Sequence, residues 1–184
     1  MKLRQWNAKV AGLAAMALLV HFAGTTYMYL TYKYFPVFTV VCARILAGLM
    51  ILHVLLSLIK LLRQDRGAAV KYPKLNARLI IQRASAILTL ILFLIHDGNM
   101  HFMSTGQPIS MGTFWYKLLI TYAFYAALFT HIALSMSRAC ITFGDFRTKE
   151  AEKKVDVITF VVCGILFVLG CYAVTYVLNL WPKL

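Results

Sequence analysis

The chain has 184 residues, of which 61% are hydrophobic and 14% are charged, and its formal net charge is +13. This composition excludes an ordinary soluble domain, in which apolar residues make up about half of the total, and it indicates an integral membrane protein. The sequence contains no flavin-binding or nucleotide-binding fingerprint, which excludes dinucleotide chemistry within the chain.

Five apolar stretches are long enough to cross the hydrocarbon core of a bilayer, which takes about 20 helical residues. They cover residues 10–30, 37–62, 79–103, 114–136 and 157–180. We therefore predict an all-α fold, an integral membrane bundle of five transmembrane helices that forms a single domain over residues 1–184. Because the connections are short, we expect sequential helices to run antiparallel.

The first stretch has some features of a secretory signal peptide, because basic residues precede it and the pair Ala23-Gly24 resembles a cleavage site. The apolar run continues, however, through Tyr27 to Leu30, which gives it the length of a spanning helix. We expect this segment to be retained as the first helix.

Basic residues are distributed unevenly over the two ends of the predicted helices. Fifteen of the 19 fall on one side, and the other side has only Lys33, Arg44, Lys117 and Lys183. The side with fifteen is expected to be cytoplasmic, with the N-terminus inside and the C-terminus outside the inner (cytoplasmic) membrane of the cell. The charge also suits anionic lipid headgroups or an acidic soluble partner, and no nucleic-acid partner is expected.

Four histidines, His21, His53, His96 and His131, each lie in a different predicted helix. An ionisable side chain at membrane depth is costly and usually marks function. Histidine is also the commonest metal ligand and an axial ligand of haem iron. Four such residues are enough for two haem b groups, each held by two imidazoles. Zinc is a poorer match, because no carboxylate or cysteine stands at either level to complete a tetrahedral set.

His53 and His131 are predicted to lie at one depth. Each precedes a basic residue by seven positions, Lys60 and Arg138 respectively, so each lies about 10 Å from the basic side. Positions i and i+7 share a helix face. Lys60 and Arg138 are therefore candidate partners for the propionates of an inner haem held by His53 and His131, unless they only extend to the headgroups.

His21 and His96 are predicted to lie deeper. They are 12 and 13 residues from Lys9 and Arg83, which corresponds to roughly 18 to 20 Å. We expect this pair to hold an outer haem, with Arg44 as a candidate propionate or quinone partner unless it extends to the interface. Three small residues share a helix face with His21: Ala14, Ala17 and Gly24. Small side chains there leave room for a porphyrin, although small residues also allow membrane helices to pack closely without any cofactor.

The four cysteines lie in or beside apolar segments, without the spacing of a zinc or iron-sulphur site: Cys42, Cys140, Cys163 and Cys171. The CxxCH motif for covalent haem attachment is absent. We interpret the cysteines as small core residues.

Four stretches of the chain carry a family resemblance: Trp6-Asn7-Ala8-Lys9 leading to His21, His53 with Lys60, Ile81-Gln82-Arg83-Ala84-Ser85 through His96, and His131 through Arg138 to Phe146. With them the chain resembles the di-haem cytochrome b subunit of succinate:quinone oxidoreductases and quinol:fumarate reductases, the single-chain anchor with five helices. The resemblance covers nearly the whole chain and depends on the register of the four histidines more than on any short motif.

This resemblance implies that His53 and His131 ligate the inner haem and that His21 and His96 ligate the outer haem, which agrees with the depth count. It also implies two cytoplasmic partners, a flavoprotein that interconverts succinate and fumarate and an iron-sulphur protein that connects it to the membrane. The chain would then be the electron-transfer subunit of the enzyme, exchanging electrons with quinone, most commonly menaquinone in the di-haem class.

One position departs from the family pattern. Some fumarate reductases of this family carry a membrane glutamate two residues before the fourth ligand, as part of a compensating proton path. Here that position is Phe129, and no glutamate lies within a predicted helix. That path is not expected in this chain, so turnover with a quinone at the outer face should move charge across the membrane.

Quinone reduction requires protons as well as electrons. Asp97, the only acidic residue expected on the outer side, directly follows His96, and Asn99 and His101 come just after. We predict a quinone site here, with Asp97 as the proton-transfer group; the alternative is that Asp97 and Asn99 merely end the helix. A competing quinone site on the basic side would use a different set: Trp6, Asn7, Gln82, Arg83 and Ser85.

Two other functions remain open from the sequence. The chain could be the cytochrome b subunit of another membrane oxidoreductase, of the hydrogenase or formate dehydrogenase type. It could also be a haem-free transporter or assembly protein that uses its histidines as a proton relay. An optical spectrum separates either type of cytochrome b, which should show b-type absorption bands, from the haem-free transporter or assembly protein.

Overall fold

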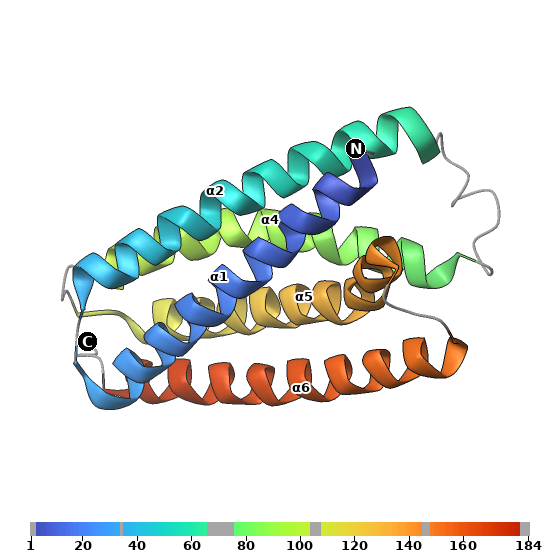
Figure 1. The fold of residues 1–184 in the computed structure, drawn as a ribbon. Coiled ribbons are helices and arrows are strands. Elements are labelled where there is room, and N and C mark those ends of the chain that lie inside the picture. The colour runs from blue at the N-terminus through green and yellow to red at the C-terminus, as the bar shows by residue number, and fades with distance from the viewer. Residues whose placement is uncertain (1–2, 34, 66–75, 104–107, 145–147, 181–184) are drawn as a thin grey trace. The chain divides into compact units, whose positions relative to one another are not determined.

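The computed structural model describes residues 3–33, 35–65, 76–103, 108–144 and 148–180. Within these ranges the chain forms no β-strand and five long α-helices: α1 (Leu3–Thr31), α2 (Pro36–Lys60), α4 (Ala77–Met103), α5 (Met111–Phe143) and α6 (Lys149–Asn179) (Figure 1). A short π-helical turn, η1 (Leu61–Asp65), continues α2. The predicted all-α class with five helices is confirmed.

All five helices are long and apolar enough to cross a membrane. Large apolar side chains, among them Leu94 and Val168, are exposed along them. An apolar surface of this extent is stable in lipid and not in water. The chain is therefore a multi-pass membrane protein.

Three helices extend well beyond the apolar stretches that predicted them. α1 begins at residue 3 instead of 10, α5 ends at 143 instead of 136, and α6 begins at 149 instead of 157. Hydropathy detects only the part of a helix that lies in lipid, whereas polar residues continue the helix beyond it. In α6 the first turn of the extension contains Glu150 and Glu152, whose charges suit the positive end of the helix dipole.

The described helices fall into two compact units. The first comprises Met1–Ala77 and Met136–Val155, with α1, α2, the end of α5 and the start of α6. The second comprises Arg78–Ser135 and Asp156–Leu184, with most of α4, α5 and α6. The expectation of a single domain over residues 1–184 stays a prediction.

In the first unit, α1 and α2 run antiparallel (Figure 1). Near the start of α1, the Ser57 hydroxyl donates to Asn7 Oδ1 at 3.2 Å. Near its end, the Thr39 hydroxyl contacts the Met28 sulphur at 3.1 Å. These two contacts set the register of the two helices.

Gly24 lies at a close contact between α1 and α2. A Cβ atom added there would lie 2.6 Å from Cε1 of Phe38, so glycine is what admits the Phe38 ring. This is the small-residue packing common between membrane helices. Gly24, one of the small residues on the helix face of His21, therefore allows α1 and α2 to pack within this unit.

In the second unit, α4 and α5 run antiparallel. Gln82 Nε2 donates to Ser135 Oγ at 2.8 Å, and further along α4 the His96 ring stacks on Phe124. α5 is joined in turn to α6 by a hydrogen bond between the Tyr122 and Thr175 hydroxyls.

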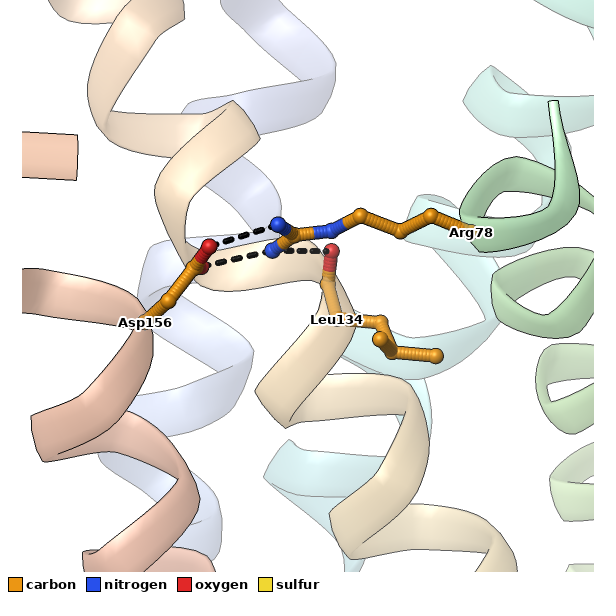
Figure 2. Close-up of polar contacts among 3 residues, drawn as sticks. All are labelled: Arg78, Leu134 and Asp156. Atoms are coloured by element: carbon orange, nitrogen blue, oxygen red, sulfur yellow. Dashed lines mark hydrogen bonds and ion pairs between the residues drawn. The ribbon is translucent and has the colours of Figure 1, made fainter. Parts of the chain in front are cut away.

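A single arginine links all three helices of this unit. The two Nη atoms of Arg78, on α4, donate to the carboxylate oxygens of Asp156, on α6, at 2.5 and 2.6 Å (Figure 2). One of them also reaches the Leu134 carbonyl oxygen of α5 at 3.5 Å. The guanidinium thus ties α4, α5 and α6 together at one end of the unit.

Candidate functional site

The four histidines are divided between the two units. His21 and His53 lie in the first unit, on α1 and α2, and His96 and His131 lie in the second, on α4 and α5. All four are half-buried. Each predicted haem pair takes one histidine from each unit, so the pairing stays a prediction.

Within the first unit, His21 and His53 lie at different levels. The hydrogen bond between Asn7 and Ser57 sets the register of α1 against α2. In this register His53 lies opposite residue 11 of α1, about ten residues from His21. At 1.5 Å per residue the separation along the helices is roughly 15 Å.

The second unit separates its histidines in the same way. Gln82 of α4 is bonded to Ser135 of α5, so His131 lies opposite about residue 86 of α4, ten residues from His96. His96 stacks on Phe124, which is seven residues from His131 on α5. The separation along the helices is therefore roughly 10 to 15 Å. Each unit by itself therefore holds its two histidines at two separate levels.

The separation in the first unit exceeds the roughly 8 to 10 Å that follows from counting to the nearest basic residue. The two basic residues from which the depths are counted, Lys9 and Lys60, do not lie at the same depth. In the register of the first unit, Lys9 lies opposite residue 55, about five residues further into the apolar span than Lys60. A lysine side chain extends toward the interface. Its Cα position is therefore a poor marker of the membrane boundary.

His131 has the best-defined surroundings of the four. Its Nδ1 lies 3.0 Å from the backbone carbonyl oxygen of Gln82. A carbonyl only accepts hydrogen bonds, so Nδ1 carries the proton and the lone pair of the neutral ring is on Nε2. A bond of this kind orients histidines that bind metal and raises their basicity as ligands.

Further hydrogen bonds surround this contact. Gln82 Nε2 donates to Ser135 Oγ, and Ser135 Oγ donates to the His131 carbonyl oxygen at 2.5 Å. Ser85 Oγ donates to the Gln82 carbonyl oxygen at 3.0 Å. We call Gln82, Ser85, His131 and Ser135 the Gln82 cluster. Because its members come from both α4 and α5, the cluster holds the His131 ring in one orientation.

His96 is oriented by aromatic contacts. Its ring stacks on Phe124, with ring centroids 4.8 Å apart and an interplanar angle of 22°, and it lies 6.5 Å from the Tyr125 ring. Stacking fixes the plane of the imidazole.

His21 has a different environment. Its Nδ1 is buried, and among the described residues it has no hydrogen-bond partner. A buried polar nitrogen of this kind is costly unless it binds something. On α2, His53 precedes Ser57 by one turn, and Ser57 is bonded to Asn7 of α1.

The surroundings of His131 suit a histidine that ligates haem iron. Within the described ranges no group of three or more histidine, cysteine or acidic side chains comes together. A haem held by two imidazoles needs no such group, because the porphyrin supplies the remaining four ligands of the iron. The tautomer of His131 is the observation that favours a haem ligand.

The predicted propionate partners lie on the same helices as their histidines. Lys60 is half-buried in the last turn of α2, and Arg138 is half-buried on α5. Arg44 is exposed on α2. None of these positions excludes the snorkelling alternative.

The predicted outer quinone site falls mostly outside the described side chains. Asp97, Asn99 and His101 lie on α4, which continues to Met103, so the helix does not end at Asp97. Their side chains lie outside the described part of the structure. Their roles therefore stay predictions.

The competing quinone site divides between the two units. In the first, Trp6 is exposed with the Lys9 ammonium 5.8 Å from its ring centre, and Asn7 accepts from Ser57. In the second, Gln82 and Ser85 belong to the Gln82 cluster with His131.

The Arg78–Asp156 ion pair and the hydrogen bonds of Ser135 are not among the features predicted from the sequence. A signal for the ion pair was present, because Asp156 is one of only six acidic residues and directly precedes the apolar stretch 157–180. An acid at such an edge favours a basic partner on a neighbouring helix. Which residue supplies it depends on the fold.

No family model, curated protein or solved structure matches this chain. The likeness to di-haem anchors stays a resemblance.

Proposed function

We propose that the chain is the di-haem cytochrome b anchor of a succinate:quinone oxidoreductase or quinol:fumarate reductase. It passes electrons between a cytoplasmic iron-sulphur subunit and membrane menaquinone or another quinone, while a flavoprotein subunit carries out the dicarboxylate chemistry. The observation that carries the proposal is the hydrogen bond from His131 Nδ1 to the Gln82 carbonyl oxygen. It gives His131 the tautomer and orientation of a metal ligand.

In this proposal His53 and His131 hold the inner haem, and His21 and His96 hold the outer one. When bound, the haems supply one-electron redox chemistry that protein side chains lack. Within each unit the two histidines are separated along the helices, by roughly 15 Å in the first and roughly 10 to 15 Å in the second, which supports two haems at two levels. The helices exclude water from the ligands, and the Gln82 cluster and Phe124 orient the imidazoles.

Basic side chains supply charge at the haem edges. Lys60 and Arg138 bind the propionates of the inner haem, and Arg44 binds those of the outer haem. An ammonium or guanidinium beside a carboxylate is a charge-assisted hydrogen bond, which is stronger than a neutral one.

The quinone is proposed to bind on the outer side, beside His96. Asp97 transfers protons there, and Asn99 and His101 bind the quinone oxygens. Asp97 directly follows His96, the proposed ligand, and successive side chains point about 100° apart around a helix. The carboxylate of Asp97 would therefore point to the side of the haem and not at its iron, which supports a quinone site at this location.

Turnover is proposed to move charge across the membrane. Phe129 is buried and packs against Tyr125, with ring centroids 6.3 Å apart, where some relatives carry a glutamate. In proteoliposomes containing the whole complex, turnover should slow as an opposing membrane potential grows. Turnover that is insensitive to the potential contradicts this part of the proposal.

The central experiment measures haem in the purified chain and in four alanine variants. The wild type should contain two b haems. His53→Ala and His131→Ala should lose the same haem, whereas His21→Ala and His96→Ala should lose the other. His101→Ala, outside both predicted pairs, should keep both. Absence of b-type bands in the wild type contradicts the proposal, and a different grouping contradicts the pairing.

Purification of the tagged chain from membranes tests the partners. Flavin and iron-sulphur subunits should accompany it. Recovery of hydrogenase or formate dehydrogenase subunits would instead identify another type of cytochrome b. A haem-free chain would favour a transporter or assembly protein.

A further inference from the structure

One face of α1 carries a tryptophan and a lysine, followed by a row of apolar side chains. Trp6, Lys9, Leu13, Met16 and Val20 recur every three or four residues, which places them on the same side of the helix. All five are exposed, and Leu13 and Met16 are 59% and 63% exposed. We call these five residues the Lys9 face.

The contacts of α1 within the first unit leave the Lys9 face uncovered near the start of the helix. Asn7 accepts a hydrogen bond from Ser57 of α2. Arg4 Nε donates to Thr142 near the end of α5. Because successive residues lie about 100° apart around a helix, Lys9 points about 160° away from Asn7 and about 140° away from Arg4. At this end of α1 the Lys9 face is therefore turned away from both of these helices.

Lys9 and Trp6 form a pair on this face. The Lys9 ammonium lies 5.8 Å from the centre of the Trp6 ring, within the range of a cation–π attraction. Side chains on a helix lean toward its N-terminus, so the ammonium is directed toward the basic end of α1. Tryptophan is enriched where the hydrocarbon meets the headgroups, and its indole N–H is a hydrogen-bond donor. The pair thus offers a cation and a donor at the edge of the apolar span.

The side chains described at this end of the first unit carry mostly positive charge. Besides Lys9, exposed basic residues lie at the start of α1, just after α2 and at the start of α6: Arg4, Arg63, Lys149, Lys153 and Lys154. The acidic side chains described there are Glu150 and Glu152. Basic residues near a membrane surface attract lipids with a net negative charge. This charge complementarity favours an anionic lipid over a zwitterionic one.

We propose that the Lys9 face binds one anionic phospholipid. Its phosphate accepts hydrogen bonds from the Lys9 ammonium and the Trp6 indole N–H, and one acyl chain lies along Leu13, Met16 and Val20. A hydrogen bond between charged groups is stronger than a neutral one. From Lys9 to Val20 the face extends roughly 16 Å along α1, about half of the hydrocarbon thickness, which is the depth of one leaflet.

An acidic soluble protein is a poorer match for this face. It could pair with the exposed bases, but it would not reach Leu13, Met16 and Val20, which lie within the apolar span of α1. A cation followed by a row of exposed apolar side chains matches a molecule with a charged head and an apolar chain. Lipid binding goes beyond the proposed function and does not require haem.

Quenching of Trp6 fluorescence by brominated lipid tests the binding. The chain has three tryptophans, so Trp115→Phe with Trp181→Phe leaves Trp6 as the only one. In vesicles of phosphatidylglycerol and phosphatidylcholine, one lipid at a time carries brominated chains. Phosphatidylglycerol should be favoured beside Trp6 roughly fivefold, the effect of one lysine at a membrane surface. Lys9→Gln should abolish the preference, and Lys149→Gln, the matched control, should keep it. Equal quenching by the two lipids, or an unchanged preference in Lys9→Gln, overturns the proposal.

Native mass spectrometry of the chain with its natural tryptophans is the second measurement, and it also tests the acyl chain. The wild type should retain one phosphatidylglycerol, and Lys9→Gln should lose it. The variant with both Leu13→Ala and Met16→Ala should lose it too, whereas Leu119→Ala, at a leucine 62% exposed on α5, should retain it. Retention by the double variant overturns the position of the acyl chain. Failure of the proposed function appears separately, as absence of the b-type bands.

Discussion

Arg78 and Asp156 form an ion pair with two hydrogen bonds between α4 and α6 in the second unit (Figure 2). Their side chains are 34% and 20% exposed, so the pair is partly withdrawn from solvent. Removing one partner of such a pair leaves the other charge poorly solvated, which destabilises more than the loss of an exposed pair. The ion pair should therefore contribute measurably to the stability of the three-helix unit.

Asp156→Asn is expected to lower the free energy of unfolding by about 1–3 kcal/mol, less than for a fully buried pair because of the partial exposure. Arg78→Lys should have a smaller effect, since it keeps the charge and loses the two-bond geometry. The measurement is the loss of helical circular dichroism on unfolding in mild detergent.

Glu150→Gln is the matched control, because it removes one negative charge from an exposed position in the first turn of the same helix. Its effect should stay below about 1 kcal/mol. Equal effects of the two substitutions would show that the charge of α6, and not its pairing with Arg78, is what matters.

Gln82→Ala is expected to retain both haems. The acceptor of the His131 proton is the main-chain carbonyl oxygen of Gln82, which alanine keeps. The lost side-chain bond to Ser135 should lower stability by about 1 kcal/mol. Haem content and unfolding midpoint measure the two effects separately.

Ser135→Ala removes the other partner of the hydrogen bond between Gln82 and Ser135. The variant with both Gln82→Ala and Ser135→Ala should therefore be little less stable than either single variant. Loss of the inner haem in Gln82→Ala would mean that the side chain, and not the carbonyl, orients His131.

The sequence was sufficient for the number of helices and insufficient for their ends. Leu, Ile, Val and Phe dominate each span, so the five spans follow from composition alone. Residues 3–9, 137–143 and 149–156 are mixed in polarity, and their helical state depends on propensity and on contacts made after folding. Arg4, for example, donates to the Thr142 hydroxyl at 3.0 Å, across 138 residues of sequence.

The candidate site shows the same limit. The histidines are evident from the sequence because each interrupts an apolar run. The partner of His131 is a backbone carbonyl, and every residue has one, so no sequence pattern identifies Gln82 as that partner. From the sequence Gln82 and Ser85 are candidates for a quinone site, whereas the structure brings them together with His131.

Gly24→Ala is expected to destabilise the first unit by about 1 kcal/mol. The new Cβ would lie 2.6 Å from Phe38 Cε1, and the ring must shift to avoid it. The cost is moderate because Phe38 is half exposed and has room to move. Adding Phe38→Ala to Gly24→Ala should remove the steric part of the effect.

Gly12→Ala, in the same helix, is the control, because nothing lies within 4 Å of its added Cβ. It should be neutral or slightly stabilising, since alanine favours a helix more than glycine does. If both alanines destabilise equally, the close approach of α1 and α2 at Gly24 is not the cause.

Phe124→Leu is expected to alter the outer haem and leave the inner haem unchanged. Phe124 stacks on the His96 ring, and leucine is apolar but cannot stack, so the imidazole plane should gain freedom. Because ligand orientation tunes the iron, the electron paramagnetic resonance signal and midpoint potential of one haem should shift. Both are measured in the purified chain.

Phe160→Leu provides the control, because Phe160 lies exposed on α6 and the substitution makes the same change of side chain there. It should shift neither haem. A shift of both haems in Phe124→Leu would indicate a general loosening of the second unit, since His131 lies seven residues further along the same helix. No shift at all would mean that His96 keeps its orientation without the stacked ring, and the contacts that orient it would then have to be sought at Tyr125, 6.5 Å away.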